Sequence, residues 1–371
     1  MTEKSYTIGT NPITSGDTRV RGSCRWQSPS NIALVKYWGK KHEQIPCNPS
    51  ISFTLQNAHT NTLLEWELLS EPIIDGVDFN FYFHGEEKKD FSIRIAKYLN
   101  RMAEELPVLT KYHLTISSEN TFPHSSGIAS SASAMSALAA TLVEMEAQIN
   151  GVDNSDHRDK TRILRRVSHL SRLGSGSACR SIYPKAALWG HSDYRDSTDE
   201  YAVGLEEILH PVFHDYGDAI LLVDQDEKKV SSSAGHQLME HNPYAEVRYE
   251  MARNNTEKLL DILKSGDLDN FTSLVEEEAM TLHALMMASS PGYILMHPNT
   301  IHILHLVREF RKNSGIPLCF TLDAGPNVHL LYPASSKEKV KEFILAQLVR
   351  YCKDNQWIDD KMGPGIHKLP L

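Results

Sequence analysis

Hydroxyl side chains gather in one short stretch of this chain, between Pro123 and Ser133. A serine hydroxyl both donates and accepts hydrogen bonds, so several together could bind phosphate oxygens or supply oxygen ligands to Mg²⁺. The serines of this stretch are Ser125, Ser126, Ser130, Ser131 and Ser133. The same composition also suits a serine-rich helix cap, and the stretch taken alone leaves both interpretations open.

The surrounding residues predict a strand, a loop and a helix in that order. Tyr112–Ser117 is rich in β-favouring and apolar residues and ends at a polar break. Apolar side chains recur at helical spacing between Met135 and Met145, so a helix should begin near Ser130. The unpaired N–H groups of its first turn and the positive end of its dipole then point into the loop. The sequence therefore predicts an anion site at the start of this helix.

Two common phosphate-binding loops are absent from the sequence. No G-x-x-x-x-G-K-[ST] occurs, and the nearest approach to G-x-G-x-x-G, at Gly174 and Gly176, has Cys179 in place of the third glycine. The segment P-x-x-x-G-I-A-S-S instead resembles the phosphate-binding motif of the GHMP kinase superfamily. This resemblance implies an ATP site formed by Pro123, Ser125, Ser126, Gly127, Ala129, Ser130 and Ser131. Ser130 and Ser131 are our candidate ligands for Mg²⁺.

A second candidate site lies in Ser28–Lys41, which is apolar in its middle and basic toward its end. A buried strand that ends in a solvated basic turn would explain this pattern without any ligand. Alternatively, Lys36 and Lys40, four residues apart beside the hydroxyl of Tyr37, could hold a phosphorylated ligand.

The same segment carries a family signature. N-I-A-x-x-K-Y-W-G-K, from Asn31 to Lys40, is followed by S-I-S-x-T-L, from Ser50 to Leu55. Together they resemble the N-terminal signature of the mevalonate diphosphate decarboxylases, a family within the GHMP superfamily. Pro49 stands where that family usually has serine, and we expect a local change in the loop. The resemblance implies that Lys36 is catalytic and that Tyr37 and Lys40 bind substrate.

A glycine- and serine-rich turn follows the helix predicted at Thr161–Leu173. By default such a turn is a flexible C-terminal cap. Ser175, Ser177 and Arg180, however, are three polar groups on a stretch too short for a linker. G-S-G-S-A-C-R-S is similar to a motif of mevalonate diphosphate decarboxylases, which implies that the two serines hold the substrate. It also implies that Arg180 binds the substrate's carboxylate with two parallel N–H donors.

The segment Cys319–Pro333 predicts two strands joined by a tight turn. Asp, Gly, Pro and Asn all favour turns, so a structural hairpin explains the segment without chemistry. In the functional interpretation, Asp323 projects from the strand tip into a cleft between domains. D-A-G-P-N is shared with the mevalonate diphosphate decarboxylases, and the resemblance implies that Asp323 is catalytic.

Three further positions carry weaker family resemblances. Asp226–Ser233 is similar to the family's K-x-V-S-S-x segment, which implies that Ser232 and Ser233 contact the substrate's phosphates. His283 begins a match to the pattern H-x-x-x-x-x-S-x-P-x-Y. The family usually has an arginine near the start of the helix predicted at Phe91–Leu106, and Arg94, Lys88 and Lys89 are the candidates here.

Composition narrows the class of protein. A net charge of −9 argues against a nucleic-acid or anionic-membrane partner, and it gives clustered basic residues extra weight as an anion site. The five cysteines are scattered without a C-x-x-C motif, which favours a reducing compartment over a disulfide framework or zinc site. The polar N-terminus and the lack of a long apolar run predict a cytoplasmic protein without a membrane span.

The chain of 371 residues is long for one core, and two domains are the natural prediction. We expect an extension at 1–20, an ATP-binding domain at 21–210 and a C-terminal domain at 211–371. The resemblance implies an α+β GHMP-kinase fold with the active site in the cleft between its domains. The first domain would be like the second domain of ribosomal protein S5, and the second would be a ferredoxin-like α/β domain.

The resemblance covers the chain beyond about residue 20, and it implies the ATP-dependent decarboxylation of 5-diphosphomevalonate to isopentenyl diphosphate. ATP and Mg²⁺ would be required, the organic substrate would be a phosphorylated mevalonate, and the family's habit suggests a homodimer. Three alternatives stay open: a 5-phosphomevalonate decarboxylase, a mevalonate 3-kinase and a non-catalytic ligand-binding protein of the same fold. Ser233 keeps the first alternative open, because the family usually has Thr or Arg there.

Overall fold

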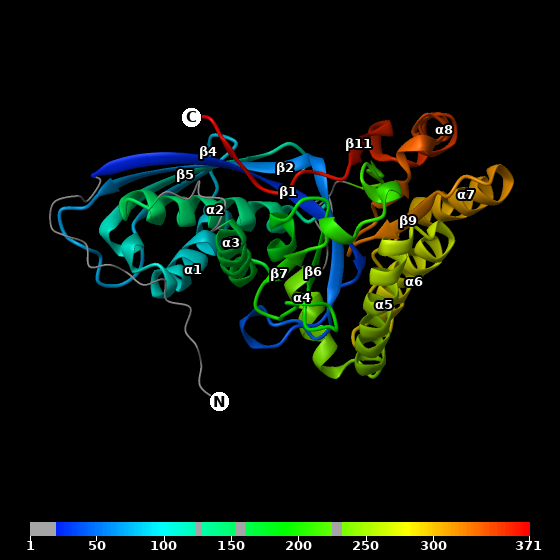
Figure 1. Cartoon of the computed structure of the whole chain (residues 1–371), viewed down its shortest axis with the longest axis horizontal. Coiled ribbons are helices and arrows are strands. Elements are labelled where there is room, and N and C mark those ends of the chain that lie inside the picture. The colour runs from blue at the N-terminus through cyan, green and yellow to red at the C-terminus, as the bar shows by residue number, and fades with distance from the viewer. Residues whose placement is uncertain (1–19, 124–127, 153–159, 225–231) are drawn as a thin grey trace.

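The computed structural model describes residues 20–123, 128–152, 160–224 and 232–371 (Figure 1). Within these residues the strands form two separate sheets, and helices pack against both. This mixed architecture confirms the predicted α+β fold class. No helix in these ranges is long and apolar enough to cross a bilayer.

The larger sheet is built on two long antiparallel strands, β1 and β2. In the part of the chain that is described, its strands follow the order β12-β1-β2-β5-β3-β4, and β6 and β7 extend it from β2. The bounds are β1 Arg21–Val35, β2 Ser50–Leu68, β3 Phe79–Phe83, β4 Glu86–Glu87, β5 Tyr112–Asn120, β6 Ala186–Trp189, β7 Ala202–Gly204 and β12 His367–Leu369. The end of the chain thus returns to the N-terminal sheet.

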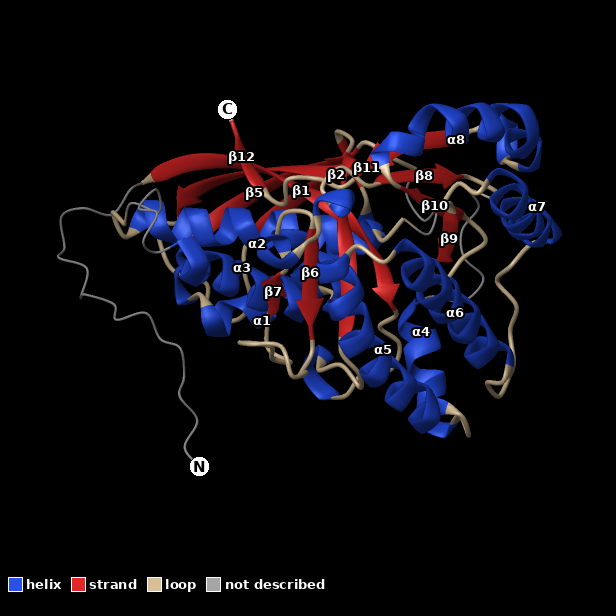
Figure 2. Ribbon diagram, turned by 45° about the vertical axis from the view of Figure 1, so that its right-hand side comes forward, coloured by secondary structure: helices blue, strands red, loops and turns tan. Residues whose placement is uncertain are grey.

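In the described part of the chain, helices cover one face of this sheet (Figure 2). They are α1 Lys89–Glu105, α2 Ser130–Ile149 and α3 Lys160–Gly174, and a short 3₁₀ helix, Gly176–Ile182, follows α3. Helix α2 is apolar along most of its length and packs on β1 and β2, where Leu138, Leu142 and Met145 are buried. The burial of α2 fixes where its N-terminus points.

The smaller sheet has the order β11-β8-β10-β9, and it is antiparallel throughout the described residues. Its strands are β8 Gly217–Leu221, β9 Cys319–Leu322, β10 Val328–Tyr332 and β11 Trp357–Lys361. The helices of this half are α4 Ser232–Gln237, α5 Ala245–Ser265, α6 Leu268–Met287, α7 Pro298–Ser314 and α8 Lys337–Phe343. α8 continues as a π-helical turn, Ile344–Leu348, and a 3₁₀ turn, Val349–Tyr351.

One of the apolar cores extends across both halves of the molecule. Ile32 of β1 and Phe53 of β2 are buried with Leu259 of α5 and Phe271 of α6. β1 and β2 are therefore long enough to serve two cores, one against α2 and one against the α5–α6 pair. The end of β1 lies where these cores meet, since Val35 belongs to the core against α5 and α6 while Tyr37 packs against the other.

A buried carboxylate also joins the halves. Asp360 of β11 accepts hydrogen bonds from three successive backbone N–H groups of β2, those of Gln56, Asn57 and Ala58, at 2.9, 2.8 and 2.7 Å. Asp360→Ala should lower the free energy of unfolding by about 3 kcal/mol, because three backbone N–H groups, one of them on buried Ala58, lose their acceptor. Asp360→Asn keeps one acceptor oxygen and should cost about half as much. Urea unfolding of both variants checks this; equal stability of Asp360→Ala and wild type would contradict it.

Most predicted elements are present, with shifted ends. The sequence also predicts helices at Tyr244–Lys264, Asp267–Ala288 and Thr300–Lys312. The structure confirms these helices, and the strand pair in Cys319–Pro333, within a few residues. The sequence predicts a final helix from Lys337 to Lys353, but regular α-geometry ends at Phe343.

Candidate active site

The N-terminus of α2 is held in place by the strand beside it. Ala129, the residue before the helix, has a left-handed backbone with φ of 43°. The hydroxyl of Ser30 in β1 donates to the carbonyl of Ile128 at 2.5 Å. Ser131 Oγ, in the first turn of α2, lies 3.3 Å from Ser175 Oγ. The predicted phosphate stretch and the glycine–serine turn therefore meet at the start of α2.

Lys36 follows the last residue of β1 and is almost completely buried. Its ammonium donates to the carbonyl of Ala33 at 2.6 Å and lies 3.5 Å from the carboxylate of Asp323. Burial lowers the pKa of Lys36, and the nearby carboxylates of Asp323 and Glu278 oppose this shift. A lysine with a lowered pKa exchanges a proton more readily near neutral pH.

Asp323 follows β9, at the turn that leads to β10. Its side chain is 28% exposed, whereas that of Lys36 is 1% exposed, so the carboxylate is the accessible member of the pair. The backbone carbonyl of Asp323 accepts from Gly325 N at 2.7 Å and from His283 Nε2 at 3.1 Å. Asp323, the carboxylate predicted at the strand tip, is thus held in position by hydrogen bonds to its backbone carbonyl. Its side chain takes no part in these bonds and can contact a substrate.

The guanidinium of Arg180 is buried and already oriented. Nε donates to Ser52 Oγ and Nη1 donates to Ser50 Oγ, both at 2.5 Å, and Nη2 lies 3.5 Å from Asn31 Oδ1. Burial lowers the pKa of Arg180, and the charge of Asp323 opposes this shift. A guanidinium has five N–H donors, so two remain for a ligand after these contacts.

Tyr37 and Lys40 lie beside this cluster. The Tyr37 ring packs against Trp189 and His236, with centroids 4.7 and 4.6 Å away, and its buried hydroxyl has no hydrogen-bond partner among the described residues. Lys40 Nζ donates to Gln44 Oε1 at 2.9 Å. Burial lowers the pKa of Lys40, and the positive charge of Lys97 on α1 lowers it further.

Some predicted site residues cannot be placed. Ser125, Ser126 and Gly127 lie outside the described residues. Ser232 and Ser233 begin α4, but their side chains are not described. The others are described: Pro123 precedes this gap, Ser130 begins α2, and the carbonyl of Ser177 accepts from Asn31 Nδ2 at 3.2 Å.

The structure adds residues that the sequence did not point to. The lysine near Lys40 is Lys97, one helical turn beyond the candidate Arg94 on α1. His236 accepts a hydrogen bond from Gly39 N at 2.9 Å, and burial lowers its pKa to about 3, so its ring is neutral. Glu278, fully buried in α6, accepts from Lys36 N at 2.9 Å. The spacing of lysines on α1 could have suggested Lys97, but nothing in the sequence marks His236 or Glu278.

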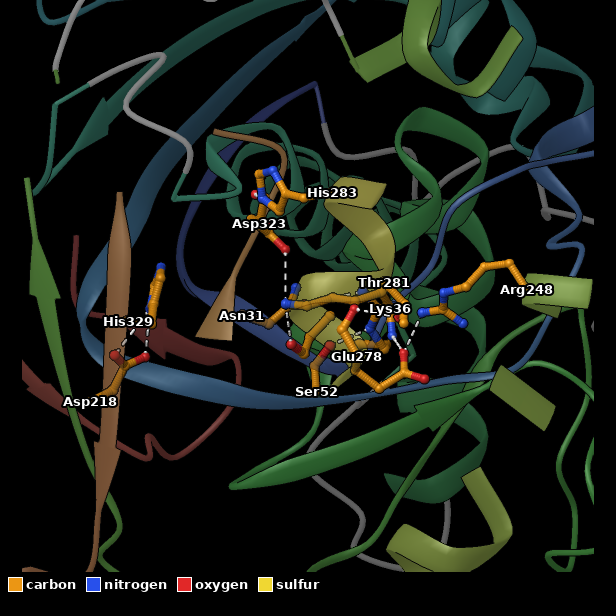
Figure 3. Close-up of polar contacts among 12 residues, drawn as sticks. Asn31, Lys36, Ser52, Asp218, Arg248, Glu278, Thr281, His283, Asp323 and His329 are labelled. Atoms are coloured by element: carbon orange, nitrogen blue, oxygen red, sulfur yellow. Dashed lines mark hydrogen bonds and ion pairs between the residues drawn. The ribbon is translucent and has the colours of Figure 1, made fainter. Parts of the chain in front are cut away.

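Together these residues form a site for an anionic substrate. A helix N-terminus with serine hydroxyls can bind phosphate, and Arg180 can bind a carboxylate. Near Arg180, the pair of Lys36 and Asp323 can move a proton and balance charge (Figure 3).

Two family models match the chain. Residues 28–202 match the diphosphomevalonate decarboxylase-like N-terminal domain, and residues 219–365 match the mevalonate 5-diphosphate decarboxylase C-terminal domain. The fold and the site define a member of the GHMP kinase superfamily. Because the two models together span most of the sequence, the chain belongs to the mevalonate diphosphate decarboxylase family.

Individual relatives agree with this assignment. The diphosphomevalonate decarboxylase of Eremothecium gossypii is 29% identical over 86% of this chain and 80% of its own length. The crystal structure of mevalonate diphosphate decarboxylase from Staphylococcus aureus is 30% identical, with a TM-score of 0.79 over 94% of this chain and 98% of that chain. A structure of MDDEF in complex with MVAPP, AMPPCP and magnesium is 26% identical, with a TM-score of 0.77 over 95% of this chain and 100% of that one.

Proposed function

We propose that this protein converts 5-diphosphomevalonate and ATP to isopentenyl diphosphate, CO₂, ADP and phosphate. The observation that carries the proposal is the contact between the buried ammonium of Lys36 and the carboxylate of Asp323, 3.5 Å apart. Arg180 is close enough for the charge of Asp323 to oppose the lowering of its pKa by burial. Family membership supports the same reaction.

The first step transfers a phosphoryl group to the tertiary hydroxyl at C3. The hydroxyl oxygen forms a bond to the γ-phosphorus of ATP, the bond from that phosphorus to ADP breaks, and the hydroxyl proton passes to Asp323 or Lys36. Asp323 would orient or deprotonate the hydroxyl, while Lys36 would lower its pKa or neutralise phosphoryl charge.

The second step removes phosphate and CO₂. The C3–O bond breaks with its electron pair on the departing phosphate, which leaves positive character at C3. The bond from C2 to the carboxylate carbon then supplies the electrons of the new double bond, and CO₂ leaves. Asp323 would stabilise the positive carbon, and Arg180 would hold the carboxylate in line until it departs.

The remaining site residues would bind the two substrates. Tyr37, Lys40, Ser175, Ser177, Ser232 and Ser233 would contact the phosphorylated mevalonate, and Lys97 is added to this set. Segment 123–131 would cradle ATP. The hydroxyls of Ser130 and Ser131 are the hard oxygen ligands that Mg²⁺ prefers, so they fit a shared magnesium site. When bound, Mg²⁺ would neutralise charge on the transferring phosphates.

A coupled assay tests this function. ADP release and CO₂ release should be equal with 5-diphosphomevalonate, and kcat/KM should fall by about tenfold or more with 5-phosphomevalonate, because one charged contact is lost. Faster turnover of the monophosphate would favour the monophosphate decarboxylase. ADP without CO₂ would indicate a 3-kinase, and no turnover with any of these substrates would favour a binding protein.

Three broader proposals accompany this function. A division of the chain near residue 210 is supported by family models that end at 202 and begin at 219. A cytoplasmic location is supported by the free thiols of Cys24, Cys47, Cys179, Cys319 and Cys352. A homodimer is proposed from the family resemblance alone, and sedimentation of the purified protein would test it.

A further inference from the structure

Helix α6 contacts the backbone of both reacting residues. Near its middle, Glu278 accepts a hydrogen bond from the N–H of Lys36. Five residues later, His283 Nε2 lies 3.1 Å from the carbonyl of Asp323. Lys36 and Asp323 come from different sheets, so α6 is a common support for two segments that are far apart in the sequence (Figure 3).

Glu278 is itself held rigidly from the neighbouring helix. Its side chain is fully buried, and its carboxylate accepts from Arg248 Nη2 at 2.5 Å and from Asn255 Nδ2 at 2.8 Å, both on α5. A buried carboxylate with three donors is strongly fixed in position, and removal of one partner leaves uncompensated charge. The end of β1 is therefore tied to the α5–α6 pair at the residue that carries the catalytic ammonium.

His283 acts as a neutral donor. The residue is 2% exposed, and burial lowers its pKa to about 4, so the ring is uncharged at neutral pH. Because a carbonyl oxygen can only accept, the neutral ring must carry its proton on Nε2 in this contact. His283 therefore fixes the backbone of Asp323 without placing a second positive charge beside Lys36.

We infer that Glu278 and His283 are positioning residues that together set the separation of Lys36 and Asp323 through backbone hydrogen bonds. This inference rests on the proposed function, because it treats Lys36 and Asp323 as the reacting pair. Neither positioning residue contacts substrate in this role. A misplacement of about 1 Å in a reacting group can cost about 100-fold in rate, so such contacts matter for turnover more than for binding.

The first test removes the contact to Asp323. His283→Gln places an amide N–H near the position of Nε2 and should retain most of kcat, whereas His283→Leu should lower kcat about 100-fold with little change in either KM. Equal kcat values for the two variants would overturn the role of His283. Both are measured by CO₂ and ADP release from the full chain.

The second test separates the charge of Glu278 from its hydrogen bond. Glu278→Gln keeps an acceptor oxygen for Lys36 N but removes the negative charge. The double variant Glu278→Leu/Arg248→Met removes the hydrogen bond without leaving a buried arginine unpaired. The double variant should lose about 100-fold in kcat, and Glu278→Gln should lose much less. Wild-type kcat in the double variant would overturn the role of Glu278.

Glu278→Gln should also move the pH profile. Lys36 is faced by Asp323 from the β9–β10 turn, by Glu278 and His283 from α6, and by Arg180 from the 3₁₀ helix. The Glu278 charge favours the ammonium, so its removal lowers the pKa of Lys36 further. The limb of the kcat/KM profile that reports Lys36 should therefore shift to lower pH. An alkaline limb would mean that the ammonium is needed, and an acid limb would mean that the amine is the base. An unmoved profile would overturn this part.

A matched control lies on the same helix. Glu276 is also buried and contacts Arg308 and Arg311 at 3.0 and 2.7 Å, away from Lys36. Glu276→Gln should lower stability but leave kcat and the pH profile unchanged. If Glu276→Gln lost as much kcat as the double variant, the loss in the double variant would come from general destabilisation, and the positioning role of Glu278 would be overturned. If wild type itself releases no CO₂ or ADP, the proposed function fails; if wild type turns over while the variants match it, the positioning role alone fails.

Discussion

Asp323→Asn is expected to lower kcat by roughly 10³- to 10⁴-fold while the protein still folds. The change keeps the size and shape of the side chain, and the Asp323 backbone keeps its contacts with Gly325 and His283. What is lost is a negative charge that is partly exposed and 3.5 Å from the ammonium of Lys36. That charge would orient or deprotonate the C3 hydroxyl and then stabilise the positive carbon, so both chemical steps should suffer.

The neighbouring lysine enlarges the effect. Asp323 is the largest of the charges that oppose the lowering of the Lys36 pKa by burial, so its removal lowers that pKa further. More Lys36 would then be neutral at a given pH, and the charge that balances the transferring phosphoryl group would be lost. Glutamine or asparagine cannot restore either charge.

The measurement is single-turnover release of ADP and CO₂ at saturating substrates, with circular dichroism as the check of folding. Asp261→Asn, which alters an exposed carboxylate on α5, is a suitable control and should leave kcat unchanged. An Asp323→Asn enzyme with more than about a tenth of wild-type kcat would exclude Asp323 from proton transfer and from carbocation stabilisation.

Several site residues could be predicted because each stands on a distinctive local pattern. Lys36 ends an apolar run, Arg180 follows a glycine–serine turn, and Asp323 begins a turn between two strands. Such patterns constrain residue type and local geometry within a few positions. They indicate that each residue is a candidate for function, but the distances between the three residues come only from the structure.

The supporting residues could not be predicted, because their contacts are made to backbone groups far along the chain. Glu278 binds the N–H of Lys36 from 242 positions away, and any residue type has that N–H. The His283 pattern was visible in the sequence, but its contact with the Asp323 carbonyl depends on how α6 packs beside β9. Local propensity carries no information on such pairings.

The ends of the strands were hard to predict for a related reason. The sequence predicts a strand at Leu63–Leu69, which covers only the last part of β2, Ser50–Leu68. Its first residues alternate between hydroxyl and apolar side chains, but both faces are buried, because Ile51 and Phe53 lie in the apolar core while Ser50 and Ser52 accept hydrogen bonds from Arg180. β11 was missed because Asp359 and Asp360 disfavour strands, and the buried Asp360 is tolerated because β2 supplies its donors.

Arg180→Ala is expected to lower kcat/KM for 5-diphosphomevalonate by about 100- to 1,000-fold, because a buried charged hydrogen-bond donor to the substrate is lost. Ser50 and Ser52 hold the guanidinium in one orientation, so Arg180 loses little freedom when it binds a carboxylate. Arg180→Lys should not rescue activity. An ammonium cannot replace a planar guanidinium that is oriented by its hydrogen bonds to Ser50 and Ser52 of β2.

The ratio of the two products identifies what Arg180 does. If Arg180 holds the substrate's carboxylate for decarboxylation, Arg180→Ala should release more ADP than CO₂. Phosphorylation at C3 depends less on the position of that carboxylate than decarboxylation does. Arg172→Ala is the matched control, since Arg172 is equally buried but donates to Glu200 and to the carbonyl of Glu43. That variant should lose stability and keep equal ADP and CO₂ release. Equal product release with wild-type kcat/KM in Arg180→Ala would place the substrate's carboxylate elsewhere in the site, and the substrate orientation proposed for the second step would have to be reversed.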